Sequence, residues 1–179
     1  MITDIWTIGH STRAIEEFIE LLQAHGIKLV ADVRLLPGSK RYPHFNREIL
    51  ISSLSESGIH YEHFPELGGR RKPRPGSINT AWRNAAFRGY ADHMETKEFL
   101  KGIERLLELA LKHERCALMC AEAVWWRCHR ALISDWLKAR GTQVTHILDA
   151  KKAETHPFTS AATVVNGKLS YTAPGSLLL

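Results

Sequence analysis

One stretch decides the fold of this chain, and it reads Cys116-Ala-Leu-Met-Cys120-Ala-Glu122-Ala-Val-Trp-Trp-Arg127-Cys128-His129-Arg130. Its first five residues carry no charge, which is typical of a short, fully buried strand. A loop that contains Glu122 follows, and residues 128–130 open a predicted helix over 131–140. Open α/β sheets build their sites from a strand, a loop and a helix N-terminus in this order. All three cysteines lie in this stretch, so we expect a redox, nucleophilic or metal role here.

The rest of the chain alternates between strand and helix patterns. Further strands are predicted over 4–8, 27–33, 59–64 and 143–148. A strand, a helix and a strand within about thirty residues indicate a right-handed crossover between parallel strands. Asn166-Gly167 predicts a turn between two short extended runs. We therefore predict one α/β domain over 1–179, with a mostly parallel sheet of about five strands, helices on both faces and a C-terminal hairpin.

The ends of the helices can also be predicted from local chemistry. Ser11 or Thr12 is a candidate N-cap for the first helix, and Asn46 is a candidate for the second. Residues 82–94 predict short helical pieces that are broken near Gly89.

Composition limits the class of protein. The chain has 179 residues, 44% hydrophobic and 24% charged, which is ordinary for a globular protein with one core. Residues 1–4 show no basic region before an apolar run, so we expect no signal peptide. No apolar run approaches the ~18 residues of a membrane span, so we expect no membrane partner. Three cysteines cannot all pair within the chain, which favours a reduced, cytoplasmic protein.

The net charge of +5 permits partners that carry phosphate. Residues 68–76 concentrate this charge in a segment rich in glycine and proline, with cations at Arg70, Arg71, Lys72 and Arg74. The segment is either a mobile, solvated loop or a loop that grips an anion. A non-catalytic nucleic-acid-binding module that acts through loop 70–74 is therefore an alternative function.

Polar side chains follow the predicted strands where each strand ends. Because the carboxyl ends of parallel strands meet at one edge of a sheet, we expect these side chains to converge there. The candidate catalytic residues are Cys128, Glu122, Cys120, His129 and Asp32. The candidate substrate-binding residues are Arg34, Arg130, Arg70, His10 and Ser11.

Each cysteine has a structural alternative. Cys116 fits a small core residue, and Cys120 fits either the core or the site. Cys128 lies at a helix N-terminus beside His129 and Arg130, where a thiol has a lowered pKa. Its role is either chemical, as nucleophile or ligand, or simple packing.

Other candidate residues also have both a structural and a functional interpretation. Asp32 and Arg34 form either a structural ion pair or part of the catalytic set. His10 either stabilises the first turn or belongs to the site. Of Trp125 and Trp126, one is expected to pack on the sheet, and the other either packs or forms a wall of the pocket.

Several of these motifs together resemble a known family. They are Gly9-His10-Ser11, Asp32-Val-Arg34 with Pro37 and Ser39, Gly58-Ile-His-Tyr61, Leu67-Gly-Gly69, and Cys120-Ala-Glu122 with Cys128-His129-Arg130. In this order they are similar to the bacterial and archaeal family numbered 488 in the domain-of-unknown-function series. The resemblance implies an α/β domain whose signature residues include Ser39 and Tyr61, which we add to the substrate-binding set. It implies no particular activity or cofactor.

The sequence predicts an enzyme whose pocket at the sheet edge binds an anionic, nucleotide-like small molecule. Arginines would hold the anion, Cys128 or Cys120 would supply a thiolate, and Glu122 or His129 would move protons. A transition-metal site formed by Cys120, Cys128 and His129 is compatible with this function, although Cys-x7-Cys-His is not a standard zinc spacing.

Overall fold

The 116–120 run forms the centre of the sheet. In the computed structural model, which describes residues 4–175, β4 (Cys116–Cys120) lies between β1 (Ile5–Gly9) and β2 (Leu29–Asp32). β3 (His60–His63) pairs with β2, and β5 (Val144–Ile147) pairs with β1. These five strands are parallel, so their carboxyl ends meet at one edge.

A sixth strand lies at one edge of the sheet, next to β5. β6 (Ala153–Thr155) runs antiparallel to β5 and completes the order β3-β2-β4-β1-β5-β6. It was not predicted, because three half-exposed residues carry no alternation that a sequence pattern could detect. The predicted hairpin is present as β7 (Thr163–Val165) and β8 (Lys168–Ser170). Asn166 and Gly167 both have positive φ, at 51° and 73°, as a two-residue turn of the mirror-image type requires.

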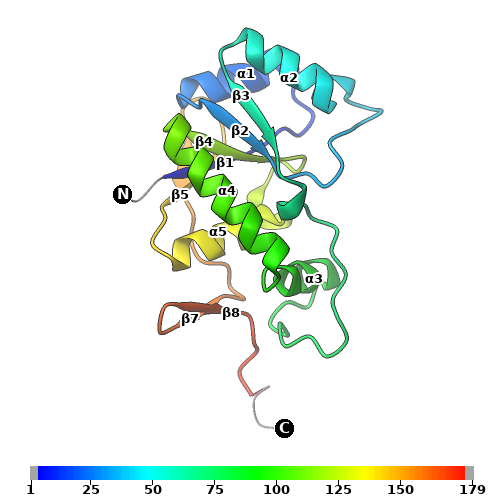
Figure 1. Ribbon diagram of the computed structural model, residues 1–179, viewed down its shortest axis with the longest axis vertical. Helices are drawn as coiled ribbons and strands as arrows, with labels where there is room; N and C mark the ends of the chain where they lie inside the picture. The colour runs from blue at the N-terminus through cyan, green and yellow to red at the C-terminus, as the bar shows by residue number, and fades with distance from the viewer. Residues whose placement is uncertain (1–3, 176–179) are drawn as a thin grey trace.

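Helices cover both faces of the sheet (Figure 1), so the predicted fold class is confirmed. The two faces are set by the alternation of β4, in which Ala117 and Met119 contact one hydrophobic cluster and Cys116 and Leu118 the other. α1 (Ile15–Ala24) and α2 (Arg47–Glu56) cover the face of Met119. α4 (Lys97–His113) and α5 (Arg130–Ala139) cover the face of Leu118.

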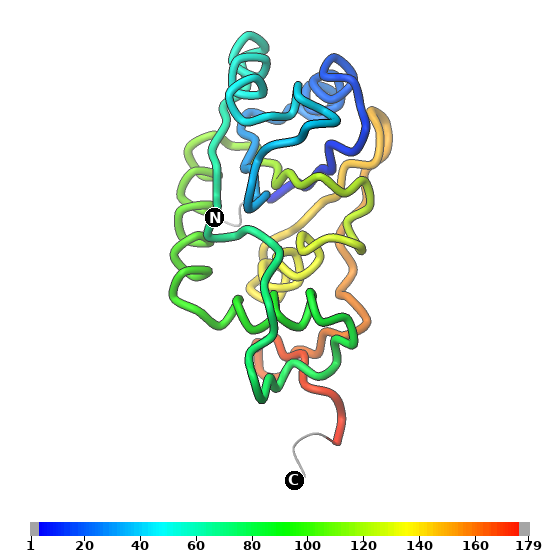
Figure 2. Tube along the Cα trace, turned by 90° about the vertical axis from the view of Figure 1, so that its right-hand side faces the viewer, coloured from blue at the N-terminus to red at the C-terminus, as the bar shows by residue number. Residues whose placement is uncertain are grey.

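The remaining helices are short. α3 (Ala85–His93) precedes α4, and the 3-10 turns are η1 (Pro43–Phe45), η2 (Pro65–Leu67) and η3 (Trp125–Arg127). Figures 1 and 2 place α1 and α2 at one end of the molecule and α3 with the hairpin at the other. Among residues 4–175, the structure contains no helix with the length and apolar character needed to cross a bilayer.

Of the two predicted helix caps, one is wrong and the other is right in position only. α1 begins at Ile15 with Ala14 at its N-cap, so neither Ser11 nor Thr12 caps it. Asn46 occupies the N-cap position of α2, but its side-chain oxygen accepts from the backbone N–H of Ser39 instead of from the helix. Ser11 therefore lies in the loop between β1 and α1.

Gly89 does not break α3, contrary to the prediction. A Cβ at this position would lie 2.3 Å from the carbonyl oxygen of Arg71, so glycine allows the basic segment to lie against the helix. Asp92 then fixes this segment, since its carboxylate accepts from the backbone N–H of Arg74 and from the Ser77 hydroxyl. Burial alone would raise the pKa of Asp92, but these hydrogen bonds lower it. The segment is therefore held against α3 by backbone contacts, while the side chains of Arg70, Lys72 and Arg74 remain exposed.

Candidate functional site

The sheet has a topological switch point between two neighbouring strands. The chain leaves β1 for α1 on one face, and it leaves β4 for α5 on the other. Crevices at such points are the usual ligand sites of open α/β sheets. The loop after β4 crosses closely over the end of β1, where a Cβ on Gly9 would lie 1.7 Å from the Glu122 carbonyl oxygen.

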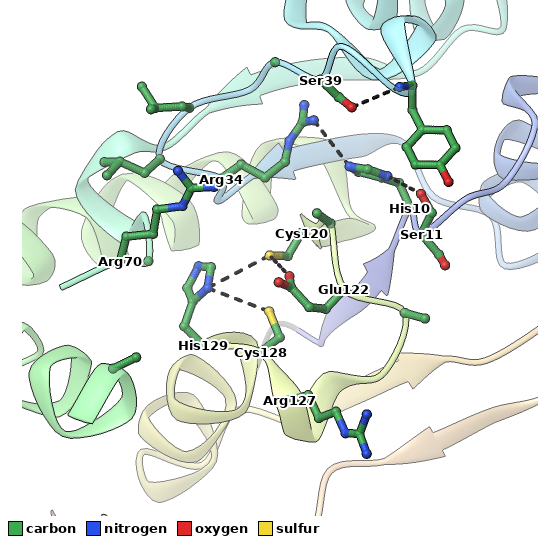
Figure 3. A pocket seen from close by; sticks show the side chains of 18 of the residues that line it. His10, Ser11, Arg34, Ser39, Arg70, Cys120, Glu122, Arg127, Cys128 and His129 are labelled. Carbon is green, nitrogen blue, oxygen red and sulfur yellow. Dashed lines mark hydrogen bonds between the residues drawn. The ribbon is translucent and has the colours of Figure 1, made fainter. Parts of the chain in front are cut away.

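A cavity of about 540 Å³ opens at this switch point (Figure 3). The loops after β1, β2 and β4, the start of α5 and the 69–70 turn all contribute to its lining. Nine of the twelve predicted site residues line it, namely His10, Ser11, Arg34, Ser39, Arg70, Cys120, Glu122, Cys128 and His129. The other three, Asp32, Tyr61 and Arg130, lie behind its wall. Asp32 contacts the lining residue Arg34, and Tyr61 contacts Asp32. Arg130 contacts the lining residue Cys128.

Two thiols and an imidazole meet at the floor of the cavity. The Nδ1 atom of His129 lies 3.7 Å from the sulfur of Cys128 and 4.0 Å from that of Cys120. Glu122 adds a carboxylate, whose Oε2 lies 3.2 Å from the Cys120 sulfur. Figure 3 shows these four side chains directed toward one another from the end of β4 and the start of α5.

A hydrogen bond on the side of the ring away from the sulfurs fixes the orientation of His129. Its Nε2 atom lies 2.9 Å from the carbonyl oxygen of Val33, which can only accept. Nε2 therefore carries a proton, and Nδ1 faces the two sulfurs. Gly69 covers the ring closely, because a Cβ there would lie 2.9 Å from Nδ1.

Arg130 is buried beneath Cys128 with no carboxylate to neutralise it. The guanidinium is 1% exposed, and no ion pair joins it to an acidic residue among residues 4–175. It donates to the carbonyl oxygen of Glu122 at 2.6 Å and to the hydroxyl of Thr7 at 3.3 Å. Its Nε–H and its backbone N–H both face the sulfur of Cys128 at 3.4 Å. A buried cation requires compensation, and a thiolate on Cys128 supplies part of it.

The two thiols of the floor differ in acidity. Burial would raise the pKa of Cys128, but a hydrogen bond from Cys120 and the charges of His129 and Arg130 hold it well below its ordinary value. The pKa of Cys120 is raised well above its ordinary value by its hydrogen bond to Cys128 and by burial. Cys128 is therefore the more acidic of the two thiols. Cys116 is fully buried in the core, as predicted, and burial raises its pKa to about 12.

Asp32 and Arg34 form a rigid ion pair at one wall. Nε and Nη2 of Arg34 donate to the two oxygens of Asp32 at 2.9 and 2.6 Å, and the Tyr61 hydroxyl donates to the same carboxylate at 2.6 Å. Nη1 of Arg34 faces Nε2 of His10 at 3.4 Å. Burial and the charge of Arg34 lower the pKa of His10 to about 4, so this imidazole is neutral at pH 7. The pair holds Arg34 at the wall of the cavity, with a guanidinium edge toward it.

Two of the residues that line the cavity have strained backbone. Ser11 and Arg70 line the cavity with φ of 51° and 60°, in the left-handed region that disfavours side chains. Such strain tends to occur at functional sites. Arg70 is exposed, so its charge is available to a ligand in the cavity.

Other lining residues had no clear signal in the sequence. Arg127 adds a third cation, and Phe87 and Tyr90 form an apolar wall from α3. Spacing alone assigns an aromatic pair on a helix to the core. Neither tryptophan lines the cavity: Trp125 stacks on His146 with ring centroids 4.5 Å apart, and Trp126 is 53% exposed.

The fold and the site together define a doubly wound α/β domain with a cysteine, histidine and arginine pocket at its switch point. Residues 14–137 match the family described as Domain of unknown function DUF488, and the chain belongs to this family. The predicted family is thereby confirmed. The matched range includes the floor of the cavity and the Asp32–Arg34 pair, whereas His10 and Ser11 precede it. No curated protein and no solved structure matches the chain.

Proposed function

We propose that the cavity is the active site of an enzyme that acts on an anionic small molecule. One observation carries this proposal: the sulfurs of Cys120 and Cys128, the Nδ1 atom of His129 and the Glu122 carboxylate meet within a single cavity. Enzymes need electron-pair donors and proton carriers at fixed distances from one substrate position. In this arrangement the thiolate side of the floor supplies the electron pair, and Glu122 supplies and removes the proton.

The walls of the cavity support the choice of substrate class. A volume of about 540 Å³ suits a ligand of nucleotide or cofactor-fragment size. Arg34, Arg70 and Arg127 present cations at the rim, which favour a phosphate or carboxylate. Phe87 and Tyr90 offer an apolar wall for the uncharged part of such a molecule.

The alternative, a nucleic-acid-binding module, has weaker support in the basic segment. Nη2 of Arg71 lies 3.3 Å from a carboxylate oxygen of Glu98, and Arg74 pairs with Glu95. These pairs reduce the charge that could contact phosphates along a strand. Arg70 faces the cavity instead.

The test is a screen of anionic metabolites, scored by ligand-induced thermal stabilisation and by turnover. Arg70→Ala should weaken binding of a responsive compound by roughly tenfold, the usual effect of losing one charge-assisted hydrogen bond. Lys72→Ala is the matched control, because Lys72 lies two residues away and does not line the cavity. Glu122→Gln should abolish turnover while binding persists. Equal losses in the Arg70 and Lys72 variants would refute the assignment of the cavity.

A further inference from the structure

We propose that Cys120, Cys128 and His129 bind a divalent metal ion of the zinc class, with the fourth coordination position open to the cavity. This inference deepens the proposed function and rests on it for the catalytic role of the ion. In this proposal the two sulfurs and the imidazole nitrogen bind the metal ion, and the ion would then act on the substrate. Two thiolates and one imidazole are a ligand set that such ions prefer.

The distances between the ligand atoms fit tetrahedral coordination. Metal–sulfur and metal–nitrogen bonds of about 2.3 and 2.1 Å at tetrahedral angles place ligand atoms roughly 3.6 Å apart. The Nδ1 atom of His129 lies 3.7 and 4.0 Å from the two sulfurs, and all three ligand atoms lie within 4.8 Å of one another. Small side-chain rotations would bring them to these bonding distances.

The surroundings of these ligands resemble the second layer of a metal site. A metal-binding histidine usually donates its other ring N–H to a backbone carbonyl, and His129 does so to Val33. Thiolate ligands are commonly stabilised by N–H donors, and the backbone and Nε of Arg130 both face Cys128. If Cys120 and Cys128 instead formed a disulfide, Nδ1 of His129 and the N–H groups of Arg130 would face uncharged sulfur atoms.

Metal binding requires Cys120 to lose its proton, and a carboxylate is in place to accept it. The sulfur of Cys120 lies 3.2 Å from Oε2 of Glu122. The proton passes to Glu122 and from there to solvent through the cavity, which Glu122 lines. The bound ion then balances the charge of the two thiolates.

Three protein ligands and an open position are the arrangement of catalytic rather than structural zinc sites. Cys120, Cys128 and His129 all line the cavity, so a water molecule or a substrate oxygen could reach the fourth position. Glu122 would lie beside that position and transfer protons to and from it. The chemistry indicated is metal-assisted hydrolysis of an anionic substrate.

Metal analysis of the full-length protein, purified with a thiol reductant and without chelators, tests the inference. Elemental analysis should find about one equivalent of zinc, or the metal-free protein should take up one equivalent. Cobalt(II) titration should give thiolate-to-cobalt absorption in the near ultraviolet. Cys120→Ser and His129→Gln should each lower metal affinity by more than the 10–100-fold that second-layer changes cost. Cys116→Ala is the matched control and should retain both the metal and the absorption, because Cys116 is in the core.

Less than a tenth of an equivalent, without cobalt absorption, would overturn the inference. Equal metal content in the wild-type, Cys120→Ser and His129→Gln proteins would also overturn it, because the ion would then lie elsewhere. Turnover by a metal-free protein that Glu122→Gln abolishes would leave the proposed function intact and refute the metal. Stoichiometric metal in a protein that binds no anion would instead refute the proposed function and retain the site.

Discussion

Arg130 and Asp135, both buried on α5, are joined by an unbroken chain of hydrogen bonds that leaves the helix and returns to it. Nη1 of Arg130 lies 3.3 Å from the Thr7 hydroxyl, which lies 2.7 Å from Nδ1 of His146. Nε2 of His146 lies 2.9 Å from Nδ1 of His156, and Nε2 of His156 lies 2.9 Å from Asp135. The chain therefore connects the cation under the cavity to a distant carboxylate.

Arg130 at one end can only donate and the Asp135 carboxylate at the other end can only accept, so donors that all point from Arg130 toward Asp135 satisfy every group in the chain. Burial and the charges of His156 and Arg130 lower the pKa of His146 to about 2. Asp135 also accepts from the hydroxyls of Thr159 and Tyr171.

Removing the charge of Asp135 should destabilise the protein strongly. Asp135→Asn replaces a buried charged acceptor with a neutral amide, so the donors of His156, Thr159 and Tyr171 lose a charge-assisted partner. We expect a loss of about 3–5 kcal/mol in the free energy of unfolding, measured by urea denaturation. Tyr171→Phe is the milder comparison, because it removes one hydrogen bond and should cost about 1 kcal/mol. A cost below that of Tyr171→Phe would contradict the role of Asp135.

The stability of the protein should fall with pH below 6.5. The folded pKa values of His10 and His146 are about 4 and about 2, whereas the ordinary value is 6.5. Between these limits the unfolded chain binds more protons, so the free energy of unfolding rises with pH and is lost as the pH falls. Each proton contributes a slope of about 1.4 kcal/mol per pH unit.

The substitution His146→Gln separates the contribution of His146 to this pH dependence from that of His10. Glutamine can accept from Thr7 and donate to His156 as the neutral imidazole does. Denaturant titrations between about pH 5 and 6 should show a slope lower by roughly 1.4 kcal/mol per pH unit than in the wild type. An unchanged slope would show that His146 is protonated in the folded state.

The strain at Arg70 predicts a difference between two substitutions. Arg70→Gly removes the cost of a positive φ, whereas Arg70→Ala keeps it. We expect the glycine variant to be about 1 kcal/mol more stable than the alanine variant by urea denaturation. Both should lose the same affinity for an anionic ligand, since both lack the guanidinium. Equal stability would mean that the backbone relaxes away from this conformation.

Gly9 should tolerate no side chain. In Gly9→Ala the new Cβ would meet the Glu122 carbonyl oxygen at 1.7 Å and displace the loop over β1. We expect a loss of about 3 kcal/mol in the free energy of unfolding, together with lower turnover. Gly38→Ala is the control: its Cβ would have only the Asn46 side chain nearby, at 3.9 Å, so stability should change little. A neutral Gly9→Ala would show that the crossing loop is not tightly fitted.

Local patterns predicted most of the fold for a physical reason. The apolar run of β4 and the three- and four-residue steps of α1 and α4 report burial directly, because the period of a side-chain pattern is a property of the backbone. The same reasoning failed at Gly89, where glycine serves an approach between segments rather than a break. It also missed β6, whose pairing depends on the edge that β5 offers.

The candidate site was predicted less completely. The parallel order of the strands brought His10, Arg34, Cys120 and His129 to one edge, as the sequence indicated. Adjacent residues of the chain can differ in whether their side chains face the cavity or lie behind its wall. Arg130 follows His129 directly, yet its guanidinium turns inward because Thr7 and the Glu122 carbonyl offer hydrogen bonds there.

The sequence by itself determined the α/β class, the central strand and the clustering of cysteine, histidine and arginine at the ends of strands. These follow from short-range periodicity and from the rule that parallel strands share one edge. Only the tertiary structure decided which nitrogen of His129 faces the sulfurs and which groups accept from the buried guanidinium of Arg130. Both depend on partners distant in the chain, Val33 and Thr7, whose positions no local pattern specifies.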